Sequence, residues 1–465
     1  MTTCLCTTDY QQVFDTIQAR TGLRVQNGRF EEAARAVDDV LAAQHLTGVH
    51  DLLNALDTTL FTAPLWQRLI QAITVGETYF FRDEGQFDAL RTHILPQLIA
   101  ERQKTGNRQL RVWSAGCASG EEPYSLAMLL HEVVPNIETW NITILGTDIN
   151  FAFLERARHG LYRASSFRGE TPAYIQSRWF RATTDGYQLD RTIRDMVMFV
   201  PLNLASNTYP LSESFTMNMD LIVCRNVTIY FDQTTVQQIV DRLYQALNNM
   251  GSLIVGHSEL STTMYREFSM CNYEKVVFYQ KTGSSNVKLP YPPSRPHRRS
   301  ARQPVVTPPP IAKPEPKPTT GEDCPAQTLE AVWVQAKQAA DREQWEEALD
   351  CLGQVETRHL FRPEFHYLRG LVQMAAGNAD EALWAWRQAL YCDPTFALAH
   401  YGLGELFAQL GDTKRAARHW HQARAAVERL DPQHHLLAAE DITVEMLQGL
   451  LTARFNLLQG GDGSG

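Results

Sequence analysis

The sequence has no run of apolar residues long enough to cross a membrane. A membrane-spanning helix needs roughly 18 apolar residues in succession, and no such stretch occurs among the 465 residues. The opening residues MTTCLCTTDYQQ also lack a basic segment followed by an apolar one, the pattern of a secretory signal. We therefore expect a protein that neither crosses nor enters a membrane by itself.

Paired cysteines and an excess of positive charge are also absent. The eight cysteines form no Cys-x-x-Cys pair and no Cys/His spacing typical of a metal site. We interpret the one close pair, Cys4 and Cys6, as part of an unstructured terminus. This usage predicts reduced thiols, a cytoplasmic location and no bound metal. The net charge of −9 argues against nucleic-acid partners, which favour basic surfaces.

The apolar content is sufficient for more than one folded domain. Apolar residues make up 44% of a chain that is longer than a single core usually supports. Helical spacing predicts an N-terminal helical subdomain over 1–75. Over 76–282, strand-like runs alternate with helical patterns, which predicts a Rossmann-like α/β domain with a doubly wound parallel sheet. Its last two runs, EFSMCNY and KVVFYQKT, predict an antiparallel hairpin at one edge.

A change in composition separates this domain from the rest of the chain. Residues 283–325 are rich in proline, which predicts an extended, semi-rigid linker. The linker carries a few basic residues that could touch an acidic partner, but we favour a solvated spacer.

The region after the linker repeats with a period of thirty-four residues. Four registers share this period: Ala336, Gly370 and Gly404; Ala348, Ala382 and Ala416; Leu352, Trp386 and Trp420; Val355, Ala389 and Ala423. Small residues at fixed places let paired helices approach closely, as in tetratricopeptide repeats. We predict an all-α domain over 326–458, with three repeats and a capping helix from Leu436 to Leu458, followed by a flexible tail over 459–465.

A glycine-containing loop follows the first predicted strand of the α/β domain. It differs from the Gly-x-Gly-x-x-Gly fingerprint because three residues separate Gly116 from Gly120, and no Gly-Lys-Ser/Thr of a phosphate-binding loop follows. The next strand ends at Asp148, whose carboxylate can accept both hydroxyls of a ribose. This combination predicts a nucleoside ligand without phosphates, such as S-adenosylmethionine. The alternative is that Asp148 caps the helix that follows it.

Six motifs then occur in a fixed order. They are GETYFFRDEGQF, VWSAGCASGEEPYS, GTDIN, FVPLNL, CRNVTIYFD and GHSE. Together they resemble the CheR family of chemoreceptor glutamate methyltransferases over about residues 10 to 282. The resemblance implies a seven-stranded methyltransferase sheet, a small β-subdomain at about 179–199 and S-adenosylmethionine as co-substrate.

The resemblance also implies roles for individual residues. Thr78 and Arg82 would lie against cofactor and active site, and Tyr230 beside the transferred methyl group. The other cofactor positions are Gly76, Glu122 at the methionine end, Asp148 at the ribose, Asn203 and Leu204 around the adenine, and Cys224, Arg225 and Asn226 on the cofactor floor.

Several of these residues have simpler interpretations when taken singly. TYFFR could be a buried aromatic segment, Tyr230 a core tyrosine, and His257 is better read as structural than as a base. Gly76 replaces an asparagine common in the family, so one side-chain hydrogen bond would be missing. The short β-subdomain argues against recruitment by a tethering peptide at the receptor tail.

The implied reaction transfers a methyl group to a receptor glutamate. A glutamate is already ionised at neutral pH, so no general base is required. Arg82 would orient the carboxylate and Tyr230 would shape the methyl passage. The alternatives are a methyltransferase with another substrate, or a repeat-containing adaptor with a weak or inactive enzyme domain. The repeats would bind the receptor, another signalling protein or the enzyme's own catalytic domain.

Overall fold

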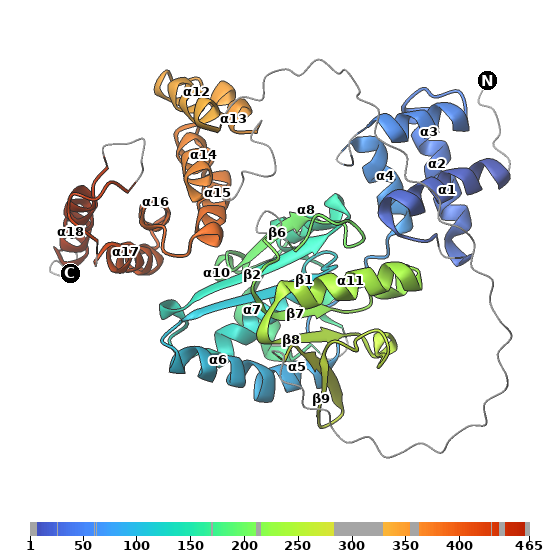
Figure 1. Cartoon of the computed structure of the whole chain (residues 1–465), viewed down its shortest axis with the longest axis horizontal. Helices are drawn as coiled ribbons and strands as arrows, with labels where there is room; N and C mark the ends of the chain where they lie inside the picture. The colour runs from blue at the N-terminus through green and yellow to red at the C-terminus, as the bar shows by residue number, and fades with distance from the viewer. Residues whose placement is uncertain are drawn as a thin grey trace, which may run out of the picture.

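The chain folds into three parts in a computed structural model (Figure 1). The structure describes residues 7–25, 27–59, 61, 63–168, 171–210, 215–282, 329–353, 362–428, 430–436 and 442–460. The predicted linker over 283–325 and Val355 of the repeat register lie outside these residues, as does most of the predicted tail.

Four helices form the N-terminal part. They are α1 (Thr7–Thr21), α2 (Phe30–Ala43), α3 (Val49–Thr58) and α4 (Pro64–Ile73). Each buries one apolar stripe in a shared core, in which Trp66 is fully buried. The Trp66 indole donates to the Leu56 carbonyl at 3.2 Å, so its one polar atom is satisfied. The predicted N-terminal helical subdomain is confirmed.

A seven-stranded sheet forms the centre of the molecule. Its strands are β1 (Gln109–Ala115), β2 (Asn141–Asp148), β6 (Val197–Pro201), β7 (Met219–Cys224), β8 (Leu247–Val255), β9 (Ser269–Tyr273) and β10 (Val276–Gln280). Their order is β6-β2-β1-β7-β8-β10-β9, with the first five parallel and β10 antiparallel to both neighbours. The predicted sheet and its edge hairpin are therefore confirmed. The strand order reverses between β1 and β7, and ligands bind such folds at the carboxyl ends of strands beside a reversal.

Helices cover both faces of the sheet. They are α5 (Glu84–Ala89), α6 (Leu95–Lys104), α7 (Glu121–Val133), α8 (Phe151–His159), α9 (Ala173–Trp179), α10 (Arg191–Arg194) and α11 (Gln233–Ala246). A second, three-stranded sheet consists of β3 (Leu161–Tyr162), β4 (Phe180–Thr183) and β5 (Gly186–Leu189). It begins and ends earlier than the expected 179–199, because β3 pairs with β5 and because Val197–Pro201 belongs to the large sheet.

One isolated β-bridge joins His435 to Thr443 in the C-terminal part, and the regular elements among its described residues are helices. They are α12 (Leu329–Asp341), α13 (Trp345–Gly353), α14 (Pro363–Ala375), α15 (Ala379–Cys392), α16 (Ala397–Gln409), α17 (Thr413–Val427) and α18 (Val444–Gly460). The six helices α12–α17 pair consecutively as three repeats, and α18 starts later than the expected capping helix. A Cβ on Gly370 would lie 2.3 Å from the Trp386 ring, and one on Gly404 would lie equally close to the Trp420 ring. The thirty-four-residue period thus places each glycine against the tryptophan of its partner helix.

We expect Gly404→Ala to destabilise the repeat domain by about 1–3 kcal/mol, because the new methyl group would displace Trp420. Gly449→Ala on α18 is the matched control. No atom lies within 4 Å of a Cβ there, so helix propensity should make that change neutral or stabilising by up to ~1 kcal/mol. Urea unfolding followed by circular dichroism measures both, and equal effects would contradict the packing argument.

Candidate active site at the carboxyl end of the sheet

Two glycines shape the loop after β1. Gly116 has φ +79° and a Cβ there would lie 2.4 Å from Val227; Gly120 has φ +93° and its Cβ would lie 2.7 Å from that of Ala157. Other residues would be strained in this conformation and would also collide with these neighbours. The loop after β1 therefore packs directly against the loop after β7, at the edge of the sheet where the parallel strands end.

Asp148 is the last residue of β2 and lies beside this loop. Its two carboxylate oxygens accept the backbone N–H groups of Ala118 and Asn150, each at 2.9 Å. Burial of the carboxyl group raises its pKa to about 6, while hydrogen bonds from backbone amides oppose the shift. The alternative role of Asp148 as a helix cap is wrong. The side chain of Asn150 caps α8 instead, by accepting the N–H groups of Ala152 and Phe153.

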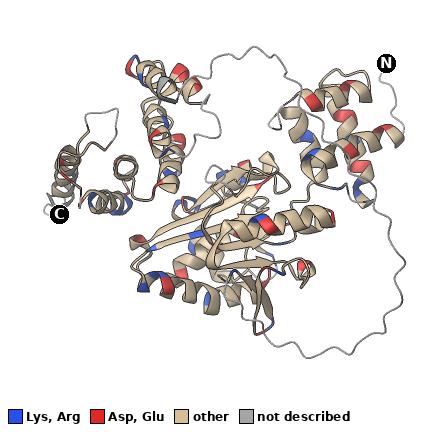
Figure 2. Cartoon of the chain, in the orientation of Figure 1, with Lys and Arg blue, Asp and Glu red and all other residues tan. Residues whose placement is uncertain are grey.

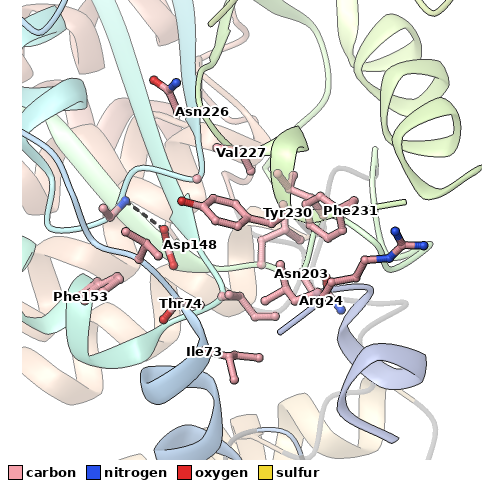
Figure 3. A pocket seen from close by; sticks show the side chains of 17 residues that line it. Arg24, Ile73, Thr74, Asp148, Phe153, Asn203, Asn226, Val227, Tyr230 and Phe231 are labelled. Atoms are coloured by element: carbon pink, nitrogen blue, oxygen red, sulfur yellow. Dashed lines mark hydrogen bonds between the residues drawn. The ribbon is translucent and has the colours of Figure 1, made fainter. Parts of the chain in front are cut away.

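A cavity of about 80 Å³ lies between Asp148 and the loop after β7, and we call it the apolar cavity. Its walls are mostly apolar, and Arg24 is the one Lys or Arg among its described lining residues. The members used below are Asp148, Phe153, Leu202, Asn203, Leu204 and Tyr230. Figure 3 shows Asp148 at one side of this cavity and the Tyr230 ring reaching toward it. The cavity suits a flat, uncharged group next to a carboxylate.

A second cavity of about 190 Å³ adjoins the first, and we call it the polar cavity. Its described lining includes Thr78, Arg82, Glu122 and Arg225. Asn226 and Tyr230, with Val75, Gly116 and Ala118, line both cavities. The two spaces therefore meet at Asn226 and Tyr230, so a ligand in the apolar cavity would be adjacent to groups of the polar one.

A buried ion pair supports the polar cavity. The Arg225 Nε donates to Glu122 Oε2 at 2.7 Å, and Ser114 Oγ donates to Glu122 Oε1 at 2.7 Å. The side chains of Arg225 and Glu122 are only 6% and 11% exposed. Arg225 also donates to the Arg82 carbonyl at 2.7 Å and to Gln86 at 3.0 Å. Arg225 thus joins the loop after β7 to the TYFFR segment and to α7.

Arg82 lies at the wall of the polar cavity. Its guanidinium donates to the Glu77 carbonyl at 2.8 Å and lies 5.7 Å from the centre of the Tyr79 ring. Arg168 stacks on the same ring at 5.2 Å and pairs with Glu77 at 2.9 Å, but it is not part of the cavity lining. The two arginines differ in access to the cavity, which makes Arg168 a useful control for Arg82.

Tyr230 belongs to a short turn that connects the α/β domain to the N-terminal helices. The Tyr230 carbonyl accepts the backbone N–H of Arg24 at 3.1 Å. The side chain is half-buried, and this burial raises the pKa of its phenol. Arg24, Leu23 and Ile73 also line the apolar cavity. The helical subdomain therefore completes the site.

The sequence analysis gave no role to Glu259, which holds the loop after β7. Its carboxylate accepts the backbone N–H groups of Asn226, Val227, Thr228 and Gly256 at 2.6–2.9 Å, and also the Thr228 hydroxyl at 2.8 Å. Asn226 adopts a left-handed conformation there, with φ +57°. The motif GHSE was visible in the sequence, but backbone partners some thirty residues away were not.

Two of the expected cofactor residues do not line either cavity. The Cys224 side chain is fully buried in the hydrophobic core, and this burial raises the pKa of its thiol. A Cβ on Gly76 would lie 2.5 Å from the Phe153 ring, so an asparagine could not fit there without displacing Phe153. Phe153, which the sequence analysis did not single out, fills this place and lines the apolar cavity.

His257 pairs with a helix cap. Its Nε2 lies 2.7 Å from Asp83 Oδ2, and Asp83 in turn accepts the Gln86 N–H at the start of α5. This contact accounts for His257 without a role as a base.

The described residues contain neither a cluster of metal ligands nor a membrane-spanning helix. Among them, no three His, Cys, Asp or Glu side chains gather as metal ligands would. No helix in those same ranges combines the length and the apolar character needed to span a bilayer.

Comparison with known proteins identifies similar chains for both main parts. Residues 76–277 match the family model described as CheR methyltransferase, SAM binding domain, and residues 370–411 match a model of the TPR repeat. The chain is 38% identical over 193 residues to the chemotaxis protein methyltransferase of Borreliella burgdorferi, covering 41% of this chain and 66% of that protein.

Two further relatives extend the match. Identity with the chemotaxis protein methyltransferase of Escherichia coli is 33% over 265 residues, covering 56% of this chain and 87% of that protein. Identity with the probable biofilm formation methyltransferase WspC of Pseudomonas aeruginosa is 30% over 382 residues, covering 78% of this chain and 86% of that protein. The similarity to WspC thus extends beyond the α/β domain.

Proposed function

Because the chain belongs to the CheR family of methyltransferases and is an S-adenosylmethionine-dependent enzyme, we propose that it methylates glutamate side chains of chemoreceptors. The product is a glutamate methyl ester that serves chemosensory signalling and adaptation. The repeats mediate contacts with other proteins. The observation that carries this proposal is the meeting of an apolar cavity beside Asp148 with a polar cavity at Asn226 and Tyr230.

The residues of the apolar cavity fit S-adenosylmethionine. Each Asp148 oxygen accepts one backbone N–H and retains a lone pair, so the carboxylate can also accept both ribose hydroxyls. Asn203 and Leu204 frame the adenine against apolar walls. Glu122, at the methionine end, attracts the amino group, and Thr78 lines the same polar cavity.

Methyl transfer requires that the methyl donor and the acceptor carboxylate are correctly positioned, and it does not require a general base. S-adenosylmethionine supplies a methyl carbon bonded to a cationic sulfur. The ionised glutamate oxygen of the substrate attacks this carbon, the carbon–sulfur bond breaks, and the products are a methyl ester and a neutral thioether. Arg82 holds the second carboxylate oxygen with its planar donor face. Tyr230 narrows the passage, and exclusion of water strengthens the attraction between the two charges.

The pKa of Asp148 predicts a pH dependence of S-adenosylmethionine binding. The carboxylate is ionised above its pKa of about 6 and protonated below it. Protonation removes charge and an acceptor site, so affinity should be full near pH 8 and about tenfold lower at pH 5. Calorimetric titration between pH 5 and 8 measures this. Asp148→Asn should bind weakly with little pH dependence, whereas an unchanged wild-type affinity across this range would exclude the proposed ribose contact.

The proposed substrate can be tested by following a radiolabelled methyl group. Purified enzyme, labelled S-adenosylmethionine and membranes containing candidate receptors should yield labelled receptor that releases methanol in alkali. Base-stable label would indicate another acceptor, and binding of S-adenosylmethionine without transfer would support the adaptor alternative. Repetition with a chain ending at Gly283 tests whether the repeats recruit the receptor.

A further inference from the structure

The repeat helix α15 contacts the sheet where its strands begin. Tyr391 donates its hydroxyl to the carbonyl of Phe215, which precedes β7. Arg111, near the start of β1, lies 4.5 Å over the Tyr391 ring and donates to the Tyr391 carbonyl at 3.1 Å. Tyr391 is buried in the same hydrophobic core cluster as the sheet residues. Helix α15 therefore packs directly against the methyltransferase domain.

The repeat helix α17 contacts the same edge of the sheet. Arg415 pairs with Asp195, which precedes β6, and Arg418 donates to the carbonyl of Trp140, which precedes β2. The catalytic crevice lies at the opposite ends of these strands. In Figure 1 the repeats and the N-terminal helices accordingly lie on opposite sides of the sheet.

A cavity of about 330 Å³ lies between the two domains, separate from the active site. Apolar residues such as Met198 and Phe407 and polar ones such as Thr143 and Gln422 line it from both sides. Its charged lining consists of four cations and two carboxylates: Arg387, Lys414, Arg415 and Arg418 against Glu138 and Asp195. Figure 2 shows α17 carrying basic residues, and the sequence of this helix contains no acid.

Arg415 already pairs with two carboxylates, Asp195 in the cavity lining and Asp412 outside it at 2.6 Å. Asp195 is shared by Arg415 and by Arg191, whose Nε lies 3.4 Å away. The Arg418 Nε is buried without an acceptor, although the same guanidinium donates to the Trp140 carbonyl, and the charge of Asp195 also acts on Arg387. Burial lowers the pKa of Arg387 and lowers that of Arg418 to about 10. The guanidinium groups of Arg387 and Arg418 are partly buried at the cavity and keep N–H donors that a bound anion can accept.

We propose that the interdomain cavity binds a small anion of the phosphate class, carrying two or more negative charges, that holds the repeats on the methyltransferase domain. Guanidinium groups present paired donors that match phosphate oxygens. The volume is at the lower end of small-molecule sites, which suits a pyrophosphate or a mononucleotide. Because Arg387 and Arg418 come from the repeats while Asn141 and Thr143, whose side chains can donate hydrogen bonds, come from the catalytic domain, the anion stabilises their docking.

Calorimetric titration of the full chain with pyrophosphate tests this site. We expect one equivalent to bind, and Arg387→Gln or Arg418→Gln to weaken binding at least about tenfold, since each removes a charge-assisted contact. Parallel titrations with inorganic phosphate, AMP and ADP distinguish an inorganic anion from a nucleotide.

The matched control is Arg424→Gln. Arg424 is an exposed arginine of the same helix α17 and stacks on Phe455, outside the cavity. It should leave pyrophosphate affinity unchanged. Absence of binding in the wild type, or equal weakening in all three variants, would overturn the proposal. S-adenosylmethionine affinity, measured in each variant, verifies the fold. No receptor substrate enters the experiment, so its result is independent of the proposed methyl acceptor.

Discussion

Glu259→Gln is expected to destabilise the methyltransferase domain by about 3 kcal/mol or more. The amide group would face two or three donors that the carboxylate now accepts, leaving buried N–H groups unsatisfied. The turn carrying Asn226 and Tyr230 would lose its anchor. Methyl transfer, expressed as kcat/KM, should therefore fall at least about a hundredfold.

Urea unfolding and initial methylation rates measure the two effects of Glu259→Gln. Glu267→Gln is the control, because the Glu267 side chain is 60% exposed and lies 3.6 Å from Arg266 at the surface. That change should alter stability by less than ~0.5 kcal/mol. If Glu259→Gln matched this control, the loop after β7 would not depend on the carboxylate.

Arg82→Ala should lower kcat by about a hundredfold while leaving the Kd of S-adenosylmethionine within about threefold. The reason is that Arg82 lines the polar cavity and not the apolar one, so it contacts the methyl acceptor rather than the nucleoside. Arg82→Lys should restore only part of the rate, because an ammonium does not present two parallel donors.

Arg168→Ala is the control for Arg82→Ala. It removes a cation from the same Tyr79 ring and a partner of Glu77, while Arg168 itself is not part of the cavity lining. Rapid quench assays for kcat and calorimetry for Kd separate the two steps. Equal rate losses in both variants would point to the Tyr79 stack, and an unchanged kcat in Arg82→Ala would exclude its orienting role.

Local patterns in the sequence predicted most of the fold. The thirty-four-residue register reports packing within each repeat, because Gly404 and Trp420 belong to one helix pair. The alternation of strands and helices likewise predicted the sheet, and the end of β2 located Asp148. These features are readable because the residues that determine them are close in sequence or recur at a fixed spacing.

Long-range contacts were not readable from the sequence. Glu259 accepts hydrogen bonds from backbone amides of a distant loop. The residue types of that loop do not show which side chain its backbone amides contact. Phe153 replaces a missing side chain at Gly76 through packing between separate elements. The contact of Tyr391 with Phe215 joins two domains across the linker. Each depends on the tertiary arrangement rather than on a local pattern.

The docking of the repeats at the starts of the strands has a geometric consequence for substrate choice. β1 has seven residues at about 3.3 Å each, so it separates the docked helices from the catalytic crevice by roughly 23 Å. A protein bound by the repeats would therefore be held at a fixed distance from the methyl donor. We expect such an enzyme to select glutamates by their distance from the captured segment as much as by the residues around them.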